Sequence, residues 1–87
     1  MWFVYILRCA DNSLYVGETN DVDLRLLKHT DGSASRLTAR RRPVTLAYQE
    51  RHDTRETALK REGQLKGWTR AKKEALIAGD LARLKLL

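Results

Sequence analysis

Cysteine and proline are nearly absent from this 87-residue chain, which has one of each, Cys9 and Pro43. A single cysteine excludes an internal disulfide framework and fits a reducing compartment, so we expect a cytoplasmic protein. No apolar run approaches the roughly 20 residues that span a bilayer, and we expect no membrane partner. The apolar stretch 2–7 has no basic region before it and predicts a buried strand rather than a signal peptide. The length predicts one small domain, residues 1–87.

The sequence signs of several catalytic classes are also missing. There is no glycine-rich phosphate loop and no hydrolase elbow. His29 and His52 lack the spacing of a zinc site, and one cysteine cannot complete it. We therefore expect no zinc centre and assign Cys9 to packing.

Acidic residues are few relative to basic ones, with 17 Lys and Arg against 11 Asp and Glu and a formal net charge of +6. A basic domain of this size favours a nucleic-acid partner, because contacts with phosphate release counterions. Solubility alone is the competing explanation. Several arginines crowd one segment that we expect to be an exposed, nucleic-acid-binding loop: Arg36, Arg40, Arg41 and Arg42.

The start of the chain predicts an antiparallel hairpin of two short strands, 2–9 and 14–18. If two or four residues connect them, Tyr15 pairs with Arg8, and Tyr5 and Tyr15 face opposite sides of the sheet. An odd connection, such as Asp11–Ser13, or a bulge places both tyrosines on one face. A shared site for the two phenols therefore predicts an odd connection.

Further along, Val44, Leu46 and Tyr48 alternate with other residues and predict a third strand that buries these three on one face, with Pro43 at its first residue. Residues 30–42 are expected to be loop. Capping residues predict four helices: 22 to 29 or 30 behind Asn20 or Asp21, a second behind Asp53 and ending near Lys66, 70–78 between Thr69 and Gly79, and a short one from Asp80 to Leu87. The fold class is α+β, a three-stranded antiparallel sheet flanked by helices in the order β-β-α-β-α-α with a short terminal helix.

Arg25 and His29 are four residues apart and project from one helical face. A guanidinium matches two phosphate oxygens and stabilises the charge that builds during attack, although a surface pair is the competing interpretation. Glu62 shares an inward stripe with Ala58 and Leu65, so its carboxylate must be paired, protonated or bound to a metal. Mg²⁺ needs only one protein carboxylate plus substrate phosphate, whereas an ion pair, for example with Arg25, is equally compatible with the spacing.

The strand tyrosines Tyr5 and Tyr15 have an equally simple explanation, since aromatic residues in strands usually pack in the core. A phenol with a pKa near 10 is a poor base at neutral pH. A cationic pocket could lower that pKa enough for the phenol to take a proton from water. The tyrosines are therefore catalytic candidates only together with the basic residues.

Together these positions resemble the GIY-YIG nuclease family, in particular its small stand-alone members. Val4-Tyr5-Ile6 stands at the first motif with valine in place of glycine, and Tyr15-Val16-Gly17 is a common variant of the second. The resemblance covers almost the whole chain and continues through Glu18-Thr19, Arg25, His29 and Gly32 to Arg41-Arg42-Pro43-Val44 and Arg61-Glu62.

The resemblance implies a metal-dependent DNA endonuclease with one Mg²⁺ or Mn²⁺ ion held by Glu62. It implies that Arg25 stabilises the transition state and that His29 serves as a hydrogen-bond partner or proton relay. Either Tyr5 or Tyr15 would activate the attacking water. With one domain, binding to DNA is expected to be sequence-indifferent or structure-directed, which suits DNA repair or recombination.

Two departures from the family pattern stand out. Glu18 directly follows the second motif, where it could repel phosphate or form a local ion pair. An asparagine of the homing endonucleases has no counterpart after Asn20. The alternative function is a catalytically weak or inactive nucleic-acid-binding module of the same fold, and the third is a structural protein that binds a partner protein.

Overall fold

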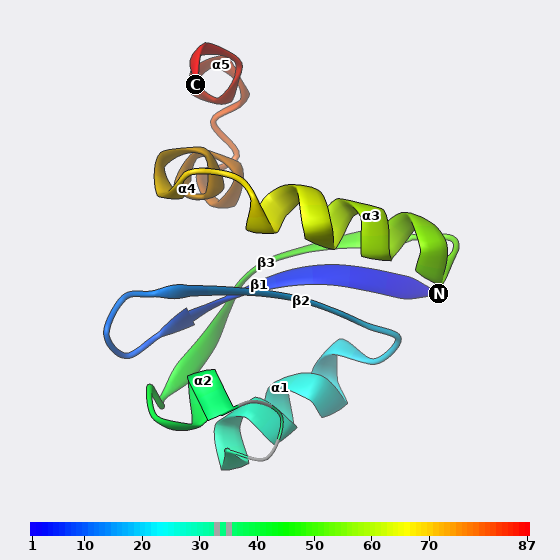
Figure 1. Cartoon of the computed structure of the whole chain (residues 1–87), viewed down its shortest axis with the longest axis vertical. Helices are drawn as coiled ribbons and strands as arrows, with labels where there is room; N and C mark the ends of the chain where they lie inside the picture. Colours follow the sequence, from blue (N-terminus) through cyan, green and yellow to red (C-terminus); the bar gives the residue numbers. More distant parts are fainter. Residues whose placement is uncertain (33, 35) are drawn as a thin grey trace.

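An antiparallel sheet with strand order β2-β1-β3 lies between two groups of helices (Figure 1). The computed structural model describes residues 1–32, 34 and 36–87, the side chains of residues 36 and 37 excepted. In this part of the chain the strands are β1 (Trp2–Cys9), β2 (Leu14–Thr19) and β3 (Val44–His52). The helices are α1 (Val22–Asp31), α2 (Arg36–Ala39), α3 (Arg55–Lys66), α4 (Arg70–Ala78) and α5 (Leu81–Leu86). The predicted fold class is confirmed, and no described helix is both long and apolar enough to cross a membrane.

Local capping explains most helix boundaries. Asp21 caps α1 by accepting a hydrogen bond from the Leu24 amide at 3.0 Å, and α1 ends at Gly32, which adopts a left-handed φ of 84°. Thr69 and Gly79 bound α4 as predicted. The predicted cap of α3 at Asp53 is wrong, because the next residue, Thr54, accepts from the Thr57 amide at 3.2 Å.

Residues 30–42 are not entirely loop as the sequence suggested. The first helix continues to Asp31, and α2 forms a single short turn at Arg36–Ala39. Propensity alone does not specify a helix this short, because nucleation of an isolated turn is unfavourable. Tertiary contacts of α2 must therefore stabilise it.

The β1–β2 hairpin has the odd connection that the sequence predicted. Cys9 donates its amide hydrogen to the Ser13 carbonyl at 2.9 Å, so three residues, Ala10–Asn12, close the turn rather than Asp11–Ser13. Asn12 has a φ of 69°, the left-handed conformation that such turns require. The resulting register pairs Leu7 with Tyr15, which places Tyr5 and Tyr15 on the same face of the sheet.

The prediction that Val44, Leu46 and Tyr48 share one buried face is wrong. Leu7 pairs with Leu46, but the preceding residue, Ile6, pairs with Tyr48, so β3 contains a bulge between these pairs. One extra residue in a strand moves every later side chain to the opposite face. Val44 and Leu46 consequently pack on the α1 side of the sheet, and Tyr48 packs on the α3 side.

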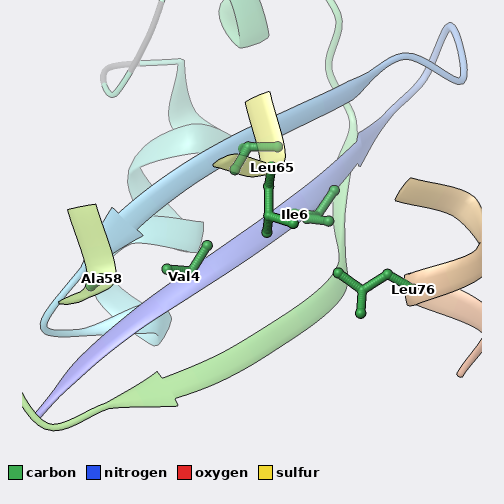
Figure 2. Packing of buried hydrophobic residues seen from close by; sticks show 6 residues of the cluster. Val4, Ile6, Ala58, Leu65 and Leu76 are labelled. Carbon is green, nitrogen blue, oxygen red and sulfur yellow. The ribbon is translucent and has the colours of Figure 1, made fainter. Parts of the chain in front are cut away.

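The central strand β1 buries side chains on both faces. Figure 2 shows Val4 and Ile6 packed against Ala58 and Leu65 of α3, with Leu76 of α4 beside them. The opposite face holds a second cluster, which includes Cys9, buried as predicted: Tyr5, Leu7, Cys9 and Val44, with Leu26 of α1 packed against them. The sheet thus separates the face that carries both tyrosines from the face covered by α3 (Figure 1).

Candidate active site

Two hydrogen bonds link three elements at the centre of the candidate site. The Tyr5 hydroxyl of β1 lies 3.1 Å from His29 Nε2 of α1, and His29 Nδ1 lies 2.7 Å from Thr38 Oγ1 of α2. Tyr5 is 2% exposed, and His29 and Thr38 are fully buried. The predicted candidates Tyr5 and His29 are therefore in direct contact.

Gly17 of β2 makes room for the Tyr5 side chain. Tyr5 pairs with Gly17 across the hairpin, and its phenol ring extends over the glycine backbone. A Cβ atom at position 17 would lie 2.4 Å from the Tyr5 hydroxyl, well inside the contact distance of two atoms. Because β2 is an edge strand, Gly17 allows the phenol to reach across it toward the edge of the sheet.

Tyr15 completes an aromatic cluster on this face. Its ring centroid lies 6.5 Å from that of Tyr5. It lies 5.0 Å from the centroid of the His29 imidazole, and the Tyr15 and His29 rings meet edge to face. Tyr15 is half-buried and is thus the more accessible of the two phenols.

Arg25 precedes His29 by one helical turn and is half-buried, and with Tyr5 and Leu46 it lines a gap too small for a water molecule. Burial raises the pKa of the Tyr5 phenol well above its ordinary 10, with Tyr15 adding to the shift and Arg25 opposing it. Burial, followed by the charge of Arg25, lowers the pKa of His29 below 6.5, which makes the imidazole neutral at pH 7. The site therefore holds a protonated phenol against a neutral imidazole.

Glu62 approaches this group from the other side of the sheet. It lies on α3, and its side chain is 19% exposed. After burial and Tyr15, the negative charge of Glu62 also helps to raise the pKa of Tyr5, so Glu62 and Tyr5 interact electrostatically. Within the described residues Glu62 forms its ion pair with Lys66, whose Nζ lies 3.6 Å from Glu62 Oε1, and not with Arg25. Lys66 is half-exposed, and such a pair contributes little stability.

Comparison with known proteins identifies the family of this chain. The sequence pattern of the GIY-YIG catalytic domain matches residues 1–75. The chain belongs to the GIY-YIG family. A UPF0213 protein of Staphylococcus aureus (strain Mu3) is 51% identical over 75 residues, which cover 86% of this chain and 92% of the relative. A UPF0213 protein of Staphylococcus saprophyticus is 46% identical over 76 residues, which cover 87% of this chain and 93% of the relative.

A solved structure gives the same assignment. The solution NMR structure of a UPF0213 protein from Bacillus halodurans is 39% identical in sequence, with a TM-score of 0.58, and the match covers 90% of this chain and 84% of that one. The predicted resemblance to small GIY-YIG members is confirmed, and the fold is of the nuclease type.

Glu18, which departs from the GIY-YIG pattern, forms the local ion pair that was one of its two expected roles. Its Oε1 lies 3.6 Å from the Arg55 guanidinium at the start of α3. Its Oε2 is buried and has no hydrogen-bond partner among the described residues. Glu18 also adds to the raised pKa of Tyr5, with a smaller effect than burial and the charges of Tyr15, Arg25 and Glu62.

The arginines of the expected binding loop have different environments. Arg40 is exposed. Arg41 lies 3.3 Å from Asp11 on the hairpin turn, and Arg42 donates to the carbonyls of Ala39 at 3.0 Å and Thr30 at 3.4 Å, which ties the ends of α1 and α2 together. The side chain of Arg36 lies outside the described residues. Arg41 and Arg42 thus support the local structure of this GIY-YIG domain.

Sequence reasoning missed the network that holds α3 on β3. Arg61, the residue before Glu62, donates to both carboxylate oxygens of Glu50 at 3.1 Å. Tyr48 and His52 each lie 2.7 Å from the same carboxylate. The bulge in β3 places Tyr48 on this face, so the network could not be found from an unbroken strand alternation.

Thr38 was also missed. It belongs to a basic segment of the sequence, and neither spacing nor a motif marks it. Only the folding of α2 against α1 brings its hydroxyl to His29.

Proposed function

We propose that this GIY-YIG protein is a divalent-metal-dependent endonuclease that hydrolyses phosphodiester bonds in DNA. The observation that carries the proposal is the buried hydrogen bond between Tyr5 and His29, set beside Arg25 and within reach of the Glu62 charge. A phenol, a neutral imidazole, a guanidinium and a carboxylate supply the groups needed to deprotonate water and to stabilise charge on phosphate.

In this proposal Tyr5 is the residue that takes the proton from water. Its raised pKa means that free phenolate is scarce at neutral pH. Tyr5 can accept a proton only while it passes its own to His29, whose Nε2 lies 3.1 Å away. Tyr15 has no such acceptor in the described part of the chain, and we assign it to shaping the site and contacting the substrate.

Arg25 and Glu62 supply the remaining functions. Arg25 would bind the scissile phosphate and stabilise its developing negative charge. The described residues contain no group of three or more His, Cys, Asp or Glu side chains that could cage a metal. They do fit a hydrated Mg²⁺ or Mn²⁺ held by Glu62 alone, because Mg²⁺ retains waters and commonly uses one carboxylate plus phosphate. When bound, such an ion would neutralise charge on the phosphate and on the leaving oxygen.

The DNA partner follows from the charge. A net charge of +6, with Arg40 exposed near the site residues of α1 and α2, favours contacts with the DNA backbone. Backbone contacts carry no base information, so we propose sequence-indifferent or structure-directed binding.

The test is cleavage of single-stranded, duplex, flapped and branched DNA by purified protein with Mg²⁺ or Mn²⁺. The Glu62→Ala variant should lose at least about 100-fold in rate while it keeps its affinity for DNA. The matched control is Glu56→Ala, since Glu56 is exposed in the first turn of the same helix. EDTA should also stop cleavage. Binding without cleavage on every substrate would reject the nuclease in favour of a nucleic-acid-binding module.

A further inference from the structure

Thr38 is one of few buried polar residues in the described part of the chain, and its hydroxyl contacts His29 Nδ1, the ring nitrogen that does not bond to Tyr5. The distance of 2.7 Å to Nδ1 is shorter than the 3.1 Å between Nε2 and the Tyr5 hydroxyl. His29 is therefore held at both nitrogens, one toward β1 and the other toward α2.

A neutral imidazole carries its proton on one nitrogen only, and each choice makes different demands on the neighbours. If Nε2 is protonated, it donates to the Tyr5 oxygen, and the phenol proton must find another acceptor. Within the described residues, His29 Nε2 is the hydrogen-bond partner of that hydroxyl, and Tyr5 is 2% exposed. A buried donor without an acceptor loses its hydrogen bond to water and gains none in return, so this tautomer is disfavoured.

The opposite tautomer gives the Tyr5 hydroxyl an acceptor and uses both ring nitrogens. With the proton on Nδ1, His29 donates to Thr38 Oγ1 and its Nε2 lone pair accepts the hydrogen of the Tyr5 hydroxyl. Both hydrogen bonds then have the same donor-to-acceptor direction: Tyr5 donates to His29, and His29 donates to Thr38.

We propose that Thr38 is a positioning residue that fixes His29 as the Nδ1-protonated tautomer and so presents the Nε2 lone pair to Tyr5. The catalytic consequence rests on the proposed nuclease function. The tautomer itself does not, and it can be measured without DNA.

In the cleavage step, the water proton moves to the Tyr5 oxygen while the Tyr5 proton moves to His29 Nε2. The water oxygen forms its bond to phosphorus, and the bond from phosphorus to the leaving sugar oxygen breaks, with the electron pair going to that oxygen. A solvent proton neutralises the leaving group. The imidazolium keeps its Nδ1 hydrogen bond to Thr38 and later returns the Nε2 proton to solvent through Tyr5.

The test uses three variants of the full chain: Thr38→Val removes the hydroxyl at nearly constant volume, Thr38→Ser retains it, and Thr45→Val is the control at an exposed threonine of β3. Nitrogen-15 NMR of the His29 ring distinguishes the protonated nitrogen from the unprotonated one. We expect Nδ1 to carry the proton in the wild-type protein, in Thr38→Ser and in Thr45→Val, and a mixture of tautomers in Thr38→Val.

Cleavage rates at saturating DNA should follow the spectra. We expect kcat to fall about 10–100-fold in Thr38→Val, with KM little changed, and to recover in Thr38→Ser. An Nε2-protonated ring in the folded wild-type protein overturns the proposal even if Thr38→Val does not fold, and so does an unchanged tautomer in a folded Thr38→Val. If the wild-type protein cuts no DNA, the nuclease proposal fails separately, and the spectra still decide whether Thr38 sets the ring.

Discussion

The Tyr5 phenol occupies the space that a side chain at position 17 would need. The second GIY-YIG motif ends in Gly17, and the register of the hairpin brings this glycine directly opposite Tyr5. The glycine is required by close approach of a neighbouring side chain rather than by an unusual backbone angle. The residue types of the two motifs are therefore coupled: the tyrosine of the first motif can reach the edge of the sheet only over the glycine of the second.

Replacement of Gly17 by alanine should displace Tyr5. The new Cβ would lie 2.4 Å from the hydroxyl and 2.5 Å from the ring carbon that bears it, so the ring must move away from its place beside His29. We expect a loss of about 1–3 kcal/mol in the free energy of unfolding, measured by urea denaturation, and a large loss of any cleavage activity.

Gly63→Ala is the matched control for this substitution. Gly63 lies in α3, and apart from the adjoining backbone of that helix no described atom lies within 4 Å of the position that an alanine Cβ would take there. Because alanine favours a helix over glycine, this variant should be more stable by about 0.5–1 kcal/mol. Equal stability of the Gly17→Ala and wild-type proteins would contradict the packing account.

The pH dependence of the site should follow His29. Its pKa is lowered by burial and then by Arg25, so the neutral form that accepts a proton persists below pH 6.5 and is lost only at more acidic pH. Cleavage should therefore decline on the acid side with an apparent pKa below 6.5.

An NMR titration of His29 checks this assignment without DNA. Arg25→Met removes a positive charge that opposes formation of the imidazolium, and the pKa of His29 should rise. A His29 pKa above 6.5 in the wild-type protein, or one that Arg25→Met leaves in place, would contradict the assigned electrostatics.

At the scale of elements, capping residues and alternation predicted most of the structure. Thr69 and Gly79 fixed the ends of α4, because side-chain and glycine caps act within one turn of the helix. The odd number of residues in the hairpin connection also followed from the requirement that Tyr5 and Tyr15 share a face. The β3 bulge opposite Ile6 and Leu7 could not be predicted in this way, since it depends on pairing between strands far apart in the chain. Thr38 was missed for the same reason: its role depends on how α2 packs against α1.

A second nonlocal contact fastens α4 to the hairpin. Arg8 donates to Glu74 Oε2 at 2.9 Å and to Asn12 in the turn, and Arg70 donates to Glu74 as well. The hydrogen bond from Arg8 is the main cause that lowers the pKa of Glu74 from 4.5 to about 2.

Glu74→Gln should therefore destabilise the protein in a pH-dependent way. The pKa of Glu74 is lowered in the folded state, so its stabilisation is present above pH 4.5 and is lost as the pH falls toward 2. Since both side chains are about one-third exposed, solvent screening reduces the effect, and we expect about 1 kcal/mol at pH 7. Thermal unfolding at pH 7 and pH 2 measures this, and a difference of the same size at both pH values would contradict the assignment.

At the scale of the whole molecule, the sheet divides the proposed catalytic groups between its two faces. Tyr5, Tyr15 and His29 lie on the α1 side, and Glu62 comes from α3 on the other side (Figure 1). The family pattern identified these residues in order along the chain, but their division between the two faces appears only in the folded structure.

The net charge of +6 predicts strongly salt-dependent binding to DNA. Arg40 is exposed, so Arg40→Ala should weaken binding about equally for all sequences and reduce the slope of log K against log salt by about 0.9. Lys85→Ala, at an exposed residue of α5, is the control and should leave the slope unchanged. Fluorescence anisotropy over a range of salt concentrations measures both, and a slope near zero in the wild-type protein would argue for a protein partner instead.

The most direct test of the central claim is the single-turnover cleavage rate of Tyr5→Phe compared with the wild-type protein in Mg²⁺ or Mn²⁺. Phenylalanine keeps the ring over Gly17 and removes only the hydroxyl that bonds to His29. The account predicts that the wild-type protein cuts DNA and that Tyr5→Phe is slower by at least about 100-fold, with unchanged DNA affinity. Equal cleavage rates in the two proteins would contradict it.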